Sequence, residues 1–224
     1  MAKLAFANTA QKDVLGLAPA DLITREWLPA WMPQLYALAA AGGEADVVAI
    51  ACARLELLGS LLVGEAGDTK SVHFAQFCDR FLTPVNPNYA KVHNLSGASH
   101  SASELHVSFR TRALAGTPPP PHAMSNPELG VVGFTVGHDE GIRTNHLRVL
   151  QQSLFIHVPT FLAELGQAVA AYAQVLRDDK ELLPGSPLKP VERFRRGLWW
   201  RLRPSGLSTK VWAAEGAARG IAPA

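Results

Sequence analysis

The sequence predicts a mainly α-helical bundle with a small β-hairpin and a basic C-terminal tail. Three observations lead to this fold class. Apolar residues recur at helical spacing over residues 18–82 and 159–179, residues 130–156 alternate as strands do, and prolines at 184, 187 and 190 set apart a cation-rich end. We therefore expect a helical domain over residues 1–183, with the hairpin near 130–156, and a tail over residues 184–224.

Composition limits the class of protein. A chain of 224 residues with 48% hydrophobic and 18% charged residues can bury one sizeable core. Its two cysteines, Cys52 and Cys78, lie in apolar helical patterns and cannot build a disulfide framework or a zinc cluster. No signal peptide is recognisable, and the apolar run 47–63 contains Arg54 and Glu56. We expect a cytoplasmic protein with no membrane span, cofactor or metal.

The first three helices are expected at residues 18–41, 44–64 and 71–82. Pro29 and Pro33 interrupt the first, which predicts two short helices or one kinked helix. The second carries a broad apolar stripe and stops at Gly64, so we expect it at the centre of the core. In the third, Phe74, Phe77, Cys78 and Phe81 share one face.

The segment Ala102–His122 is expected to be the helix around which the others pack. It carries Glu104, His106, Arg110 and Arg112 and stops at Gly116, before four prolines. Strands at 129–136 and 146–156, joined by a polar turn, then predict the hairpin, and a helix from Pro159 to Asp179 follows.

Two charged clusters remain. His138, Asp139, Glu140 and His146 are metal-ligand types, but their spacing matches no metal site and favours a solvated turn.

From Lys189 to Lys210, seven cations oppose Glu192, so this segment carries +6 and the remainder −4. The residues predicted to bind nucleic acid or another polyanion are Arg193, Arg195, Arg196, Trp199, Trp200, Arg201 and Arg203. Anionic lipid, docking on the chain's own domain and docking on a partner subunit are alternatives.

The order of ARLELLGSLLVG, FAQFCDRFL, a helix containing FR, and LFIHVPTFLAELGQAVAAY resembles uncharacterised bacterial proteins with HEPN-like helical domains. The resemblance spans roughly Glu44 to Asp179. It implies a bundle of helices, a homodimer and a place in a toxin or antiviral system. Active HEPN members cut RNA without metal, using an Arg and a His that are separated by four to six residues at the end of a helix. At that spacing after Arg110 and Arg112 this chain has no His, so the motif is degenerate.

Two functions from different classes follow. The favoured one is a non-catalytic binding or regulatory protein, associated with nucleic acid in a bacterial defence or toxin system and partnered by itself, by RNA or by another protein. The alternative is a metal-independent ribonuclease in which Arg110 or Arg112 holds the phosphate and His106 or His122 transfers the proton.

Overall fold

The computed structural model describes residues 15–89, 92–93, 99–100, 124–126, 130–150, 153–180, 183 and 185–223. The helical elements of this part are α2 (Pro19–Asp21), the π-helical turn η1 (Leu22–Trp27), α3 (Leu28–Ala40), α4 (Glu44–Val63), α5 (Ser71–Phe77), the π-helical turn η2 (Cys78–Leu82), the 3-10 turn η3 (Pro87–Tyr89), α7 (Glu140–Thr144), α8 (Val158–Asp178), α9 (Pro190–Arg201) and α10 (Thr209–Ala218). The strands are β1 (Val92–His93), β2 (Ser99–His100), β3 (Met124–Asn126), β4 (Gly130–Gly137), β5 (Val149–Leu150) and β6 (Ser153–His157).

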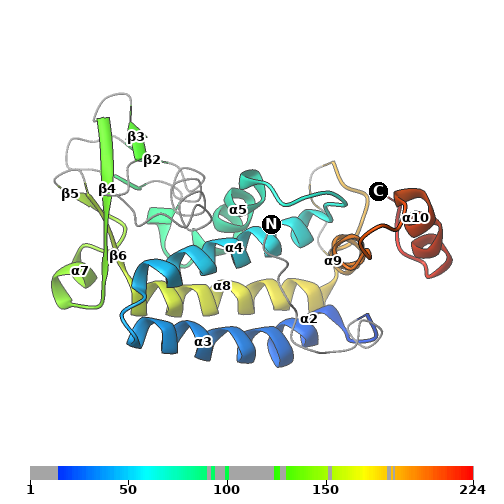
Figure 1. The fold of residues 1–224 in the computed structure, drawn as a ribbon, viewed down its shortest axis with the longest axis horizontal. Coiled ribbons are helices and arrows are strands. Elements are labelled where there is room, and N and C mark those ends of the chain that lie inside the picture. Colours follow the sequence, from blue (N-terminus) through cyan, green and yellow to red (C-terminus); the bar gives the residue numbers. More distant parts are fainter. Residues whose placement is uncertain are drawn as a thin grey trace.

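The chain is mainly α-helical, as the sequence predicts. Helices α3, α4 and α8 lie alongside one another, with the β-sheet at one end of them and α9 and α10 at the other (Figure 1). In the part of the chain that is described, no helix is both long enough and apolar enough to cross a bilayer. The segment 102–122, expected to be the central helix, lies outside the described residues.

The proline-rich first helix is one run with a π-helical turn inside it. The backbone N–H of Leu28 donates to the carbonyl of Ile23, five residues back, where an α-helix would use the fourth. This wider turn comes just before Pro29, which has no N–H to donate and would crowd a regular turn. The interruption that the sequence predicts is therefore a local widening, after which α3 continues through Pro33.

Helix α4 forms the centre of the core, as predicted. Val47, Leu55, Leu58 and Leu61 on it are fully buried, and the helix ends at Gly64, whose φ of 72° is left-handed. Helix α5 crosses α4 so closely at Gly59 that an added Cβ there would lie 1.9 Å from the carbonyl oxygen of His73.

The predicted antiparallel hairpin is wrong. Strand β4 pairs with β6 in parallel, with Phe134 opposite Leu154, and the sheet order is β3-β4-β6-β5. Between β4 and β6 the chain forms α7, whose first turn is capped by Asp139 Oδ1 accepting from the N–H of Ile142 at 3.1 Å. After α7 the short strand β5 pairs antiparallel with β6. The chain therefore reverses its direction twice between β4 and β6, whereas a hairpin reverses it once.

Helix α9 shares the core of the bundle. Phe194 is fully buried, and its ring centroid lies 5.8 Å from that of Trp27 and 6.4 Å from that of Tyr172. Leu198, one turn later, is also buried. The predicted boundary at residue 184 thus separates two segments that pack against each other.

Candidate functional site

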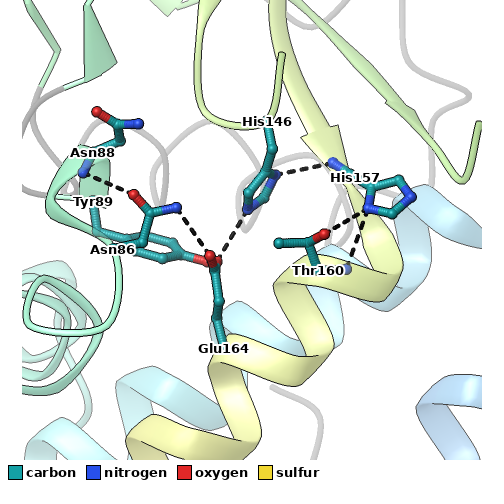
Figure 2. Close-up of polar contacts among 7 residues, drawn as sticks. All are labelled: Asn86, Asn88, Tyr89, His146, His157, Thr160 and Glu164. Atoms are coloured by element: carbon teal, nitrogen blue, oxygen red, sulfur yellow. Dashed lines mark hydrogen bonds and ion pairs between the residues drawn. The ribbon is translucent and has the colours of Figure 1, made fainter. Parts of the chain in front are cut away.

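The densest group of buried polar side chains surrounds Glu164, in the second turn of α8 (Figure 2). Its carboxylate accepts three hydrogen bonds from groups outside its own helix. Asn86 Nδ2 donates to Oε1 at 2.9 Å, while the Tyr89 hydroxyl and His146 Nε2, the latter at 3.0 Å, both contact Oε2. Glu164, Tyr89 and His146 are all buried. The group therefore joins the chain near η3, the loop after α7 and α8.

The two buried histidines of this site have their ring protons fixed by their partners. The Nδ1 atom of His146 accepts from the backbone N–H of His157 at 3.0 Å, so the ring proton is on Nε2 and is donated to Glu164. His157 caps α8: its Nδ1 accepts from Thr160, and its Nε2 donates to the carbonyl of His138 at 3.1 Å. Figure 2 shows the His146 ring between Glu164 and the backbone of His157, and the His157 ring bonded to Thr160.

The hydrogen bonds in this site stabilise the carboxylate form of Glu164. Burial raises the pKa of its carboxyl, but the hydrogen bonds from His146, Tyr89 and Asn86 outweigh burial and hold the pKa below its ordinary value of 4.5. Burial, together with the charge of Glu164, raises the pKa of the Tyr89 phenol well above its ordinary value. Tyr89 thus keeps its proton and donates it to Glu164. The arrangement positions three segments and leaves no acid or base open to a ligand.

The other residues around the predicted turn do not form a metal site. Asp139 caps α7, and the exposed His138 contacts Glu44 Oε1 at 3.2 Å through its Nδ1. Among the described residues, no three His, Cys, Asp or Glu side chains are grouped so that they could hold a metal ion. His146 belongs to the Glu164 site instead.

Replacing Glu164 with glutamine is expected to lower the free energy of unfolding by about 2 kcal/mol at neutral pH, because one donor then faces an amide N–H₂. The wild-type contribution is present above pH 4.5 and is lost as the pH falls through the depressed folded pKa, so acid should weaken the variant less than the wild type. Urea unfolding at several pH values measures this. The exposed Glu26→Gln is the control; equal acid sensitivity of wild type and Glu164→Gln would contradict the account.

Two arginines of α9 donate to the C-terminal end of α4, and a third donates to the loop that follows it. Arg193 Nε donates to the carbonyl of Leu62 at 2.8 Å, and its Nη1 donates to the carbonyl of Leu188. Arg196 Nε donates to Gly64 at 2.7 Å, and Arg201 Nη1 to Gly67 at 2.8 Å. The last carbonyls of a helix lack partners within it and attract cations. Three of the seven cations between residues 189 and 210 therefore fasten α9 onto the end of α4 and the loop that follows it.

Two tryptophans, one on α9 and one on α10, join these two helices. The rings of Trp199 and Trp212 stack 3.9 Å apart, and each indole N–H donates to the backbone carbonyl of the other residue, at 3.2 and 3.0 Å. The guanidinium of Arg219 lies 5.4 Å from the Trp199 ring centroid. This pair holds α10 against α9, with α10 at the far end of the molecule (Figure 1).

The predicted polyanion-binding residues are thus divided between the interior and the surface. Arg193 and Trp199 are buried, Arg196, Arg201 and Trp200 are half-buried, and Arg195 and Arg203 are exposed. Helix α9 packs on the chain's own helical bundle, which is one of the alternatives that the sequence leaves open for this segment. The cations that remain exposed between residues 189 and 210, here called the outer cations, are Lys189, Arg195, Arg203 and Lys210.

The predicted catalytic residues His106, Arg110, Arg112 and His122 lie outside the described residues, so their arrangement stays a prediction. Comparison with known proteins adds no relative. No family model matches the chain, and neither a curated protein nor a solved structure matches it.

Proposed function

We propose that the protein is a non-catalytic binding protein that contacts a single-stranded nucleic acid through its outer cations. The observation that carries this proposal is the division of the basic segment. Three of its arginines are taken up by backbone carbonyls, whereas Lys189, Arg195, Arg203 and Lys210 are directed to solvent. Lys and Arg side chains exposed in this way neutralise phosphates.

The contacts of the outer cations support this reading. Arg195 makes no hydrogen bond or ion pair within the described part of the chain, and Arg203 donates only from Nη1, to Thr209 Oγ1 at 2.8 Å. Within the part of the chain that the structure describes, their remaining N–H groups have no partner, so these groups can donate to phosphate oxygens. The half-buried Trp200 lies at the end of α9 and offers an aromatic surface on which a base can stack.

The non-catalytic part of the proposal is supported by the Glu164 site. Its carboxylate and imidazole are enclosed and bonded to one another, so they present neither a general base nor a general acid to a bound strand. A binding role needs no such group.

Fluorescence polarisation of a short labelled single-stranded RNA with the full-length protein, in EDTA, tests the proposal. Binding should weaken as salt rises. The double variant Arg195→Gln/Arg203→Gln should bind more weakly and reduce the slope of log affinity against log salt by about 1.4, because two phosphate contacts are lost. Arg143→Gln, an exposed arginine on α7, is the matched control. An unchanged slope in the double variant would remove the outer cations from the binding surface.

A denaturing gel of the same mixtures separates binding from cleavage. We expect intact RNA. Cleavage in EDTA that disappears with Arg112→Ala or His122→Ala would replace the proposal with the metal-independent ribonuclease. Uncut RNA that stays bound at physiological salt agrees with a binding protein.

The resemblance to HEPN-like domains supports two further parts of the proposal, a homodimer and a role in a bacterial defence or toxin system. Light scattering of the purified protein at two concentrations tests the first. A mass of one chain at both concentrations would contradict it.

A further inference from the structure

A cleft of about 970 Å³ opens beside the C-terminal end of α4. Its wall combines the last residues of α4, the α5 and η2 region, the loop before α9, α9 itself and the last described residues of the chain. Pockets for small molecules commonly enclose roughly 300–1,000 Å³, so this cleft has the size of a ligand site. It is separate from the outer cations, and the inference drawn from it does not depend on the proposed function.

The described lining of the cleft combines apolar and charged side chains. Leu62, Val63 and Leu188 supply apolar surface. Among the described lining residues, Arg80 and Arg196 contribute two guanidinium groups and Asp79 contributes the one carboxylate, so these residues together carry one net positive charge. A ligand that matches this wall has an apolar body and one negative charge.

Arg196 is the best-positioned group for that charge. Its Nε is fixed by the carbonyl of Gly64 at 2.7 Å, and its Nη1 donates to the carbonyl of Pro223 at 3.1 Å. Within the described residues, Nη2 donates to nothing. The Pro223 carbonyl oxygen occupies the position that an oxygen of a ligand would take on Nη1. If the ligand displaces this carbonyl, its carboxylate or sulfonate can accept hydrogen bonds from both Nη atoms.

We propose that this cleft binds a small amphipathic monoanion, with its anionic head on Arg196 and its apolar body against Leu62, Val63 and Leu188. Release of the Pro223 carbonyl from Arg196 accompanies binding.

Titration of the full-length protein with 8-anilinonaphthalene-1-sulfonate, a fluorescent amphipathic monoanion, tests this. We expect saturable one-to-one binding that decanoate displaces, with decanol and decylammonium at least about tenfold weaker as competitors. Arg196→Gln should weaken binding about tenfold, the effect of losing one charge-assisted hydrogen bond. Arg195→Gln, the neighbouring exposed arginine, should leave it unchanged.

A second variant is needed because Arg196→Gln can also lower binding by disturbing the packing of α9. Ser186 lines the cleft from the loop before α9, and Ser186→Trp fills the space while every arginine is kept. It should also abolish binding, at an unchanged melting temperature. Binding that survives both variants, that is lost equally in Arg195→Gln, or that decanol competes for as well as decanoate does, would overturn the proposal.

Discussion

Replacing Gly59 with alanine is expected to lower the free energy of unfolding by about 3 kcal/mol or more, because overpacking a fixed contact forces backbone movement. The new methyl group would lie 1.9 Å from the His73 carbonyl oxygen and 2.5 Å from its carbonyl carbon. These are backbone atoms of α5, so no side chain can move aside. Relief requires α5 to shift away from α4. Urea unfolding followed by circular dichroism measures the loss.

Gly166→Ala is the matched control for this substitution. Gly166 is also inside a long helix, α8, and an added Cβ there meets no described atom within 4 Å. Alanine should therefore stabilise the protein by about 0.5–1 kcal/mol through helix propensity alone. If the two variants change stability equally, α4 and α5 are not in backbone contact and the described packing is wrong.

Replacing Arg193 with alanine is expected to cost about 3–5 kcal/mol, since truncation leaves a cavity and strands hydrogen-bonded carbonyls. Arg193 is fully buried and bridges the carbonyls of Leu62 and Leu188. Its Cα also lies 3.0 Å from the position that a Cβ on Gly64 would take, so α9 touches the end of α4 at this point. Thermal and urea unfolding report the loss.

Arg195→Ala, two residues later on the same helix, separates charge from burial. Arg195 is exposed, and its removal should change stability by no more than about 0.5 kcal/mol while weakening RNA binding. The two arginine variants on this helix thus have different expected effects. Arg193→Ala lowers the stability of the fold, whereas Arg195→Ala lowers the affinity for RNA. Equal stability of both would mean that the inward-facing arginines do not hold α9 in place.

Periodicity predicts most of the helical fold correctly. The helices over 44–64 and 159–179 follow from apolar stripes and end where Gly64 and Asp179 turn left-handed. The parallel pairing of β4 and β6 could not be predicted in this way, because alternation shows that a strand is half-buried and is the same in either direction. The short helix α7, which reverses the chain again, has only five residues and leaves little periodic signal.

The sites are harder to predict than the fold, because the residue type gives the charge of a side chain but does not tell whether that side chain is buried. The charge pattern predicts that Arg193 binds a polyanion together with the other arginines of α9, although Phe194 and Leu198 at helical spacing mark a buried side of this helix. The Glu164 site was missed. A signal was present, since Glu164 interrupts the apolar stripe of α8 beside Leu165, three residues after Phe161, and a carboxylate in such a stripe needs partners. Those partners, Tyr89 and His146, are distant in the sequence.

Hydrogen exchange of the intact protein tests most directly the central claim that the basic C-terminal segment folds as part of the helical bundle. If Arg193 and Phe194 fasten α9 into the shared core, the amides of α9 must open with the same free energy as those of α4. The expected result is equal protection of the two helices. Exchange of α9 at a clearly lower free energy, while α4 stays protected, would show that the segment is a separate tail and would contradict it.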